Sequence, residues 1–317
     1  MIEQFTSLIA DGTLLVMWGA LLFHVLLPIP YQAHPMTLWQ KFASQLAEKV
    51  NGKGDYSQRL LYGTLAWLLM WTPALLVLIA AYPLVWDQRL FELALLLLAI
   101  DWRSSEKLAK GLVNSLGNND KQQARAQLAF HVNRQTDTLS PLGLGKAGAE
   151  TLLLGYSRNV IAVLFWFGLT GGIGAFMYRL ACELARAWSP SRESLRPFGL
   201  PAVYMLAVFD YLPLRLFALL LCVGRNGKHA LTTMWQQGKQ WQLPGPGWLL
   251  AAVGGKLELS LGGPAIYLQQ KLMRPKLGGR IAPAAYHLAQ LHRLLNVRIV
   301  IWIAIQSLLI LLLKQGL

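Results

Sequence analysis

The chain has 317 residues, of which 55% are hydrophobic and 14% are charged. In soluble globular domains about a quarter of the residues are charged, and disordered chains combine low hydrophobicity with high charge, so the composition argues against both classes. The 29 Lys and Arg residues outnumber the 15 Asp and Glu residues, which gives a formal charge of +14. Such an excess suits nucleic acid, anionic lipid or an anionic substrate. In so apolar a chain, lipid is the first candidate.

Six apolar segments are candidates for membrane-spanning helices, each of which needs about 20 mostly apolar residues. In chain order they cover residues 13–29, 60–86, 90–100, 160–177, 199–223 and 299–313. The polar turn Asp87-Gln88-Arg89 joins the second segment to the third, which is too short to span a bilayer without its flanks. Strand signals are absent. We therefore predict an all-α, polytopic integral membrane protein with about five or six transmembrane helices.

The basic residues are unevenly distributed among the polar connections. Segments 30–59, 101–158 and 224–296 hold 21 of the 29 Lys and Arg residues. The positive-inside rule assigns these segments to the cytoplasm, which puts the acidic N-terminus and segment 178–198 on the other side. We expect a single membrane domain over residues 1–317, in which 101–158 and 224–296 form a cytoplasmic helical layer.

The basic segment 224–296 contains nine Lys and Arg residues, three tryptophans and one acid, Glu258. Mixed basic and aromatic residues can bind single-stranded nucleic acid. Beside a membrane, contact with the lipid of the inner leaflet is the simpler interpretation. We therefore expect no nucleic-acid partner, and we predict a helix over 248–259 that lies against the membrane. A pocket for an anionic substrate is the alternative.

Asp210 and Arg215 are opposite charges within the apolar segment 199–223. An ionisable residue inside a membrane costs at least a few kcal/mol and is a functional-site hypothesis by default. Five residues apart, the two side chains would not share a face of a regular helix, but Pro213 is expected to break this helix. Two interpretations stay open: a structural ion pair and a functional site.

Three other patterns give weaker indications of function. Gly143-Leu144-Gly145-Lys146 lacks the spacing of a phosphate-binding loop and is interpreted as a loop between helices. Gly168 and Gly172, four residues apart in an apolar segment, favour close helix packing. No two of the six histidines have the i, i+4 spacing of a helical metal site, so no metal site is predicted.

Several short patterns follow one another in a recognisable order. They are His34-Pro35, Asn119-Asp120, Asn133-Arg134-Gln135-Thr136, Glu150-Thr151, Tyr211-Leu212-Pro213-Leu214-Arg215 and Leu261-Gly262-Gly263-Pro264. Over about residues 30–280 these patterns resemble the CobD/CbiB family of cobalamin-biosynthesis membrane proteins.

The resemblance implies a multi-pass protein of the bacterial inner membrane with adenosylcobinamide-phosphate synthase activity. Such an enzyme joins an aminopropanol, or its phosphate, to the carboxylate of adenosylcobyric acid and gives adenosylcobinamide or its phosphate. It uses ATP and Mg²⁺. The implied partner is therefore a corrinoid substrate or another anionic small molecule.

The same resemblance implies which residues form the site. Arg134 and Arg215 would hold a phosphate or a carboxylate, because guanidinium groups bind such oxygens in pairs. Glu150 and Asp210 would be catalytic and would bind the amine or a metal ion. The other residues of the same cytoplasmic pocket would contact the substrate, namely His34, Thr136, Tyr211, Gly262 and Gly263.

The sequence departs from the family pattern at several acidic positions. Segment 154–159 lacks both acids that the family carries there, segment 182–187 lacks the family's Asp, and Gln135 stands in place of another Asp. Segments 209–215 and 227–231 look at least as much like the AmpE-like proteins of the same superfamily. The alternative function is therefore a non-catalytic, AmpE-like signalling protein of the inner membrane. Homo-oligomerisation is left open in both cases.

Overall fold

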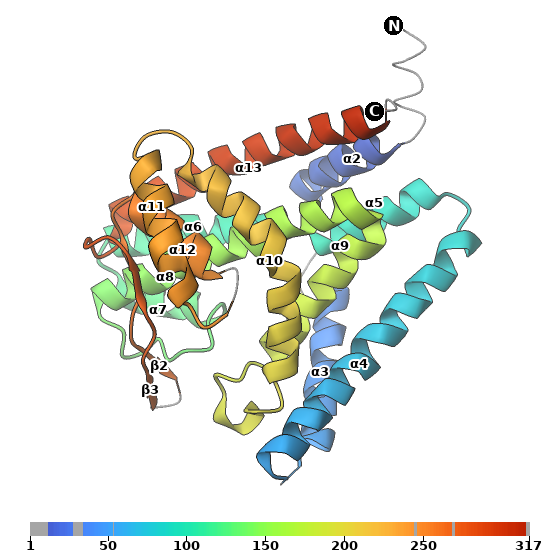
Figure 1. Ribbon diagram of the computed structural model, residues 1–317, viewed down its shortest axis with the longest axis horizontal. Helices are drawn as coiled ribbons and strands as arrows, with labels where there is room; N and C mark the ends of the chain where they lie inside the picture. Colours follow the sequence, from blue (N-terminus) through green and yellow to red (C-terminus); the bar gives the residue numbers. More distant parts are fainter. Residues whose placement is uncertain (1–11, 28–33, 53, 244–245, 268–269, 315–317) are drawn as a thin grey trace, which may run out of the picture.

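The computed structural model describes residues 12–27, 34–52, 54–243, 246–267 and 270–314. Helices dominate these residues, as predicted (Figure 1). In chain order the helices are α2 (Thr13–Leu26), α3 (Pro35–Val50), α4 (Tyr56–Ala81), α5 (Gln88–Ala99), α6 (Trp102–Gly117), α7 (Lys121–Ala129), α8 (Pro141–Tyr156), α9 (Val163–Ala187), α10 (Leu200–Cys222), α11 (Gly227–Gln237), α12 (Pro246–Lys256) and α13 (Ala285–Lys314). A π-helical segment, Ser157–Ala162, joins α8 to α9.

Four helical runs among the described residues are long and apolar enough to cross a membrane. They are Tyr56–Leu84, Pro141–Ala187, Leu200–Cys222 and Ala285–Leu313. Helix α2 is also apolar but has 14 residues, and α5 has 12. Most large apolar side chains of α4 are exposed, and a hydrocarbon environment is the surrounding that such a surface requires. The prediction of an all-α polytopic membrane protein is confirmed.

Helix α8 lies in the interior of the helical layer formed by α6, α7, α11 and α12, on the left of Figure 1. It packs against α6, α12 and α13. Nine of its 16 residues are buried, Glu150 among them. Ser140 caps the N-terminus of this helix, because its hydroxyl accepts the Gly143 N–H at 3.2 Å. The layer thus has a buried central helix that carries a carboxylate.

The run Pro141–Ala187 has 47 residues, which at 1.5 Å per residue is more than twice the bilayer core of about 30 Å. Thr170 and Gly171 have non-helical backbone angles, and Gly171 has a φ of 69°. The chain turns sharply there (Figure 1). The prediction of one span over 160–177 is therefore wrong. Gly172 does permit close packing, because a Cβ there would lie 2.7 Å from the carbonyl oxygen of Glu92 on α5.

Hydrogen bonds join segments that the charge count placed on opposite sides of the membrane. The Arg186 guanidinium donates to the Phe130 carbonyl, and the Asn51 amide donates to the Ser194 carbonyl at 2.7 Å. Such bonds cannot bridge a core of about 30 Å. The segment that follows α9 therefore lies on the same side as the segments before α4 and α8, and the prediction that put 178–198 on the opposite side is wrong. The turn at Gly171 explains the difference, because it sends α9 back.

Two helices differ in detail from the prediction. Helix α10 continues through Pro213 from Leu200 to Cys222 and changes direction part-way (Figure 1), so the proline does not end it. Helix α12 is buried along its whole length, and it packs against α10 and α11. The prediction that a helix over 248–259 lies against the membrane is therefore wrong.

Short strands follow α12 where none were predicted. β1 (Ser260–Gly262) pairs antiparallel with β4 (Lys276–Gly278), and β2 (Ala265–Tyr267) pairs antiparallel with β3 (Gln270–Leu272). Three residues are too few for a period-two hydrophobic pattern, which explains why the sequence gave no signal. β1 packs against both α8 and α12, and it carries the glycine turn toward Glu150.

Candidate functional site

Glu150 is 6% exposed. Its carboxylate accepts the Gly262 backbone N–H at 2.8 Å through Oε1, and through Oε2 it forms ion pairs with Arg134 at 3.3 Å and Arg274 at 3.2 Å. A buried carboxylate needs both a counter-charge and hydrogen bonds, and both oxygens have such partners here. Glu150 thus holds together three segments that are far apart in the sequence.

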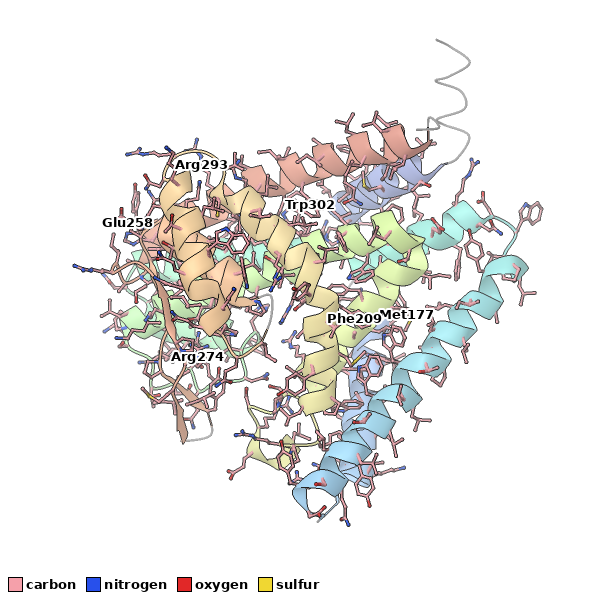
Figure 2. All side chains as sticks on the ribbon, in the orientation of Figure 1. Met177, Phe209, Glu258, Arg274, Arg293 and Trp302 are labelled. Atoms are coloured by element: carbon pink, nitrogen blue, oxygen red, sulfur yellow. The ribbon has the colours of Figure 1, made fainter. Side chains whose placement is uncertain are left out.

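The turn between β1 and β2 brings backbone close to this carboxylate. Gly262 and Gly263 have φ values of 70° and 81°, which favour glycine. A Cβ at Gly262 would lie 2.2 Å from the Pro275 carbonyl oxygen, so a larger residue does not fit. The Gly263 carbonyl accepts the Arg274 Nε–H at 3.0 Å and so orients that guanidinium toward Glu150. Figure 2 labels Arg274 in the part of the layer that carries the strands.

Arg134 and Thr136 belong to the loop between α7 and α8. The Gln135 N–H donates to the Ile266 carbonyl of β2 at 3.2 Å, and Thr136 is buried. This bond holds the loop against the strand and brings the Arg134 guanidinium to Glu150. Burial lowers the pKa of Arg134 and the Glu150 charge opposes that shift, so the arginine stays protonated.

A cavity of about 190 Å³ lies beside this group. Its lining residues are Arg134, Leu139, Gly143, Lys146, Gly262, Pro264, Ala265 and Ile266. The Lys146 ammonium lies beside the glycine turn, 3.5 Å from the position that a Cβ on Gly263 would occupy. Three cations, Arg134, Lys146 and Arg274, face one carboxylate here. The net positive charge favours an anion such as a phosphate or a carboxylate.

Asp210 on α10 is fully buried. Its carboxylate forms an ion pair with Arg158 at 2.7 Å and accepts the Tyr178 hydroxyl at 2.6 Å. Arg215 instead stacks on Tyr211, with its guanidinium carbon 3.7 Å from the ring centre. The hypothesis of an Asp210–Arg215 ion pair is therefore wrong. Helix α10 bends part-way but stays helical through Pro213, so the two residues still point in different directions.

His34 caps the N-terminus of α3. Its Nδ1 accepts the Met36 N–H at 3.3 Å, which leaves the proton of the neutral ring on Nε2. Burial and the charge of nearby Arg179 hold the pKa of His34 below its ordinary value, so the ring is neutral near pH 7. Arg179 itself pairs with Glu183 at 2.8 Å and with Asp101 at 3.7 Å.

The structure divides the predicted pocket among separate places. Glu150, the loop of Arg134 and the glycine turn lie together. In the part of the chain that the structure describes, no ion pair or hydrogen bond joins the remaining predicted residues to Glu150, and none of them lines its cavity. These residues are His34, Asp210, Tyr211 and Arg215.

The two predicted catalytic carboxylates do not fit a magnesium site. Mg²⁺ takes oxygen ligands in near-octahedral geometry, whereas the oxygens of Glu150 and Asp210 are already engaged by arginines and other donors. Among the described residues no group of three or more His, Cys, Asp and Glu side chains gathers. The basic cavity fits a phosphate group better than a cation.

Sequence reasoning missed Lys146, Arg274 and Arg158. Lys146 precedes Glu150 by four residues on α8, a spacing that was visible, but its glycine-rich surroundings were taken for a loop. That interpretation is wrong, because α8 begins at Pro141 and residues 143–146 all belong to it. Gly145 lets the Pro283 carbonyl approach the helix closely, since a Cβ at Gly145 would lie 1.8 Å from that carbonyl oxygen. Arg274 and Arg158 meet their partners through long-range packing, for which the sequence offers no local signal.

Comparison with known proteins decides the family. The family model for "CobD/Cbib protein" matches residues 17–296. The chain belongs to the CobD/CbiB family. The family resemblance read from the motifs is thus confirmed.

Members of the CobD/CbiB family with curated names are similar over most of the chain. The cobalamin biosynthesis protein CobD of Stutzerimonas stutzeri is 32% identical over 90% of this chain and 94% of its own length. The CobD protein of Chromobacterium violaceum is 34% identical over 72% of both chains. The cobalamin biosynthesis protein CbiB of Salmonella typhimurium is 30% identical over 56% of this chain and 57% of its own. No solved structure matches.

Proposed function

We propose that this CobD/CbiB-family protein is an amide-forming ligase of cobalamin biosynthesis or salvage. It would join an aminopropanol, or its phosphate, to the carboxylate of adenosylcobyric acid. The observation that supports the proposal is the positively charged cavity beside Glu150 in a chain of this family. A phosphorylated amine, a nucleotide and a carboxylate are all anions, and such groups suit a cavity lined by Arg134 and Lys146.

In this proposal the basic side chains bind and orient the reacting groups. Arg134 and Lys146 line the cavity and hold a phosphate or carboxylate. Glu150 acts as a positioning residue, since its Oε2 holds Arg134 and Arg274 in place. ATP would enter as a substrate that transfers a phosphoryl group to the carboxylate and leaves as ADP. The amine nitrogen would then attack the acyl carbon and lose a proton, the bond from that carbon to the phosphate oxygen would break, and the same cations would stabilise the departing phosphate.

The site is proposed to face the cytoplasm from the bacterial inner membrane. ATP is available on that side, and the segments around the site carry most of the basic residues. The predicted contacts at His34, Tyr211 and Arg215 lie outside the small cavity and are proposed to contact the bulky corrinoid. Asp210 is proposed to act on the position of Arg158, with which it is paired.

Complementation tests this proposal. In a bacterial strain without its corrinoid ligase, growth on adenosylcobyric acid should be restored by the wild-type gene and strongly reduced by Lys146→Gln. The matched control is Lys107→Gln, which removes the same charge from an exposed position on α6 and should complement fully.

Purified protein provides the direct assay. Incubation with ATP, Mg²⁺, adenosylcobyric acid and aminopropanol phosphate should yield the amide, detected by mass spectrometry. The Stutzerimonas relative serves as the comparison enzyme. Absence of product from this protein, under conditions in which the relative forms it, would rule out the ligase.

A second candidate is the AmpE-like signalling function. One observation favours it: Glu150 and Asp210, the two predicted catalytic carboxylates, both form ion pairs with arginines and so are less available for catalysis. In that case deletion of the gene would leave growth on adenosylcobyric acid intact and would alter β-lactamase induction. The ligase predicts the reverse pattern in the same strain.

A further inference from the structure

Helix α11 has one buried face and one exposed face. Ala230, Thr233 and Met234 are buried, and the helix packs on α12 through this side. On the other side Lys228, Leu231 and Trp235, at positions i, i+3 and i+7, share an exposed surface. Arg225 lies two residues before the helix, and Lys239 lies in the 3₁₀ turn Gly238–Gln240 that follows it. We call these five residues the α11 face: Arg225, Lys228, Leu231, Trp235 and Lys239.

The centre of the α11 face is apolar. Leu231 is 39% exposed and Trp235 is 55% exposed. The Trp235 ring is nevertheless held in place, because Trp248 packs against it edge to face with 4.7 Å between the ring centres. Tryptophan fixed at a surface in this way is typical of the boundary between a membrane and water.

Helix α10 packs beside α11 and carries exposed apolar residues near its end. Leu216 and Leu219 are exposed in its last two turns, and Val223 is exposed directly after it. Leu200–Cys222 is one of the most apolar runs among the described residues, and α11 follows directly after its exposed apolar end, so we take α11 to lie at the edge of a lipid-facing surface. A helix in that position meets the phospholipid headgroups.

The charge on the α11 face is of one sign. Arg225, Lys228 and Lys239 are exposed, and α11 itself contains no Asp or Glu. The one acid between residues 224 and 296 is Glu258, which follows α12. The Arg298 guanidinium of α13 donates to the Val223 carbonyl, in the turn between α10 and α11, and adds a further positive charge near the α11 face. Such a cluster attracts anionic headgroups.

We propose that the α11 face binds anionic phospholipid in preference to neutral phospholipid. Leu231 and Trp235 enter the acyl boundary, while Arg225, Lys228 and Lys239 contact headgroup phosphates. An amphipathic helix with basic flanks lies in the interface in this manner. The role that the sequence suggested for 248–259 thus belongs to α11, since α12 is buried. This assignment does not depend on the ligase proposal.

The experiment uses the full-length protein in nanodiscs of equal phosphatidylglycerol and phosphatidylcholine. After gentle extraction, native mass spectrometry counts the lipids that stay bound. The test variant is Lys228→Glu/Lys239→Glu, and the control is Lys107→Glu/Lys121→Glu. The control reverses the same two charges at exposed positions of α6 and α7, helices that carry no large exposed apolar residue over Trp102–Ala129.

Wild type and control should retain phosphatidylglycerol in excess, and the test variant should lose that excess. Each lysine is expected to raise the ratio of bound phosphatidylglycerol to bound phosphatidylcholine about fivefold, which corresponds to about 1 kcal/mol. Lys228→Gln/Lys239→Gln should lose a smaller part and guards against misfolding of the double Glu variant. An unchanged lipid ratio in the Gln variant would overturn the proposal. A changed oligomeric mass with an unchanged ratio would do the same and would assign the face to a protein contact.

Discussion

The Arg274 guanidinium lies 3.2 Å from Oε2 of Glu150, although 124 residues separate the two in the chain. Glu150 belongs to the buried helix α8, and Arg274 follows the glycine turn and β3. Both side chains are largely buried, at 8% and 12% exposed. Breaking one partner of a buried ion pair costs more than the pair contributes, because a charge is left without compensation. This contact therefore ties the strand segment to the helical layer.

The first prediction concerns that tie. Glu150→Gln should lower the free energy of unfolding by about 3 kcal/mol, because a neutral amide leaves Arg134 and Arg274 buried without a counter-charge. Glu48→Gln, at an exposed position of α3, should leave it unchanged. Thermal unfolding in detergent, followed by tryptophan fluorescence, measures both. Equal midpoints for the two variants would contradict the assigned role of Glu150.

The second prediction concerns the glycine turn. Gly262→Ala should destabilise the protein by about 2 kcal/mol or more, because a Cβ would meet the Pro275 carbonyl oxygen at 2.2 Å and the φ of 70° disfavours alanine. Gly117→Ala is the matched control, since nothing lies within 4 Å of its Cβ position. It should be neutral or slightly stabilising. The same thermal assay serves, and a tolerated Gly262→Ala would show that the turn does not need glycine.

Part of this site was accessible from sequence. The family resemblance grouped Glu150, Arg134 and the turn at Gly262, and these three are in contact in the structure. Their partner Arg274 was not found, because the strand ladder that positions it consists of three-residue strands without a periodic pattern. The turn at Gly171 was not predicted, although Gly168 and Gly172 beside it were read as packing positions, because a glycine that permits packing and a glycine that breaks a helix look the same in one sequence.

The third prediction separates the two charge partners proposed for Asp210. In a double-mutant cycle, Asp210→Asn and Arg158→Gln should be coupled by about 1–3 kcal/mol, because the side chains are in contact. Asp210→Asn and Arg215→Gln should add within about 0.5 kcal/mol, because Arg215 stacks on Tyr211 instead. Unfolding in mixed detergent micelles supplies the free energies. Strong coupling to Arg215 would restore the ion pair inferred from sequence.

The fourth prediction is a pH dependence at Glu106 on α6. Burial acts to raise the pKa of this carboxyl, but hydrogen bonds from His292, Tyr156 and Lys110 outweigh it and lower the pKa from 4.5 to about 2. Because the folded value is the lower one, the stabilisation is fully present above pH 4.5 and is lost as the pH falls toward 2. Because the carboxylate is partly exposed and water screens its partners, the stabilisation amounts to on the order of 1 kcal/mol. Unfolding midpoints between pH 7 and pH 3 should therefore fall more steeply for the wild type than for Glu106→Gln, and parallel curves would refute the prediction.

The last prediction concerns the side of the membrane on which the segment after α9 lies. The Asn51 amide donates to the Ser194 carbonyl at 2.7 Å, so both segments must be on one side of a core of about 30 Å. In a background with Cys182→Ala and Cys222→Ala, the single variants Ser194→Cys and Lys49→Cys should react with a membrane-impermeant maleimide from the same side. Trp86→Cys, in the fully exposed turn at the other end of α4, should react from the opposite side. Labelling of intact cells and of inverted vesicles distinguishes the two sides of the membrane. If Ser194→Cys instead reacted together with Trp86→Cys, the α9 turn at Gly171 would not return the chain, and the charge count made from sequence alone would be right.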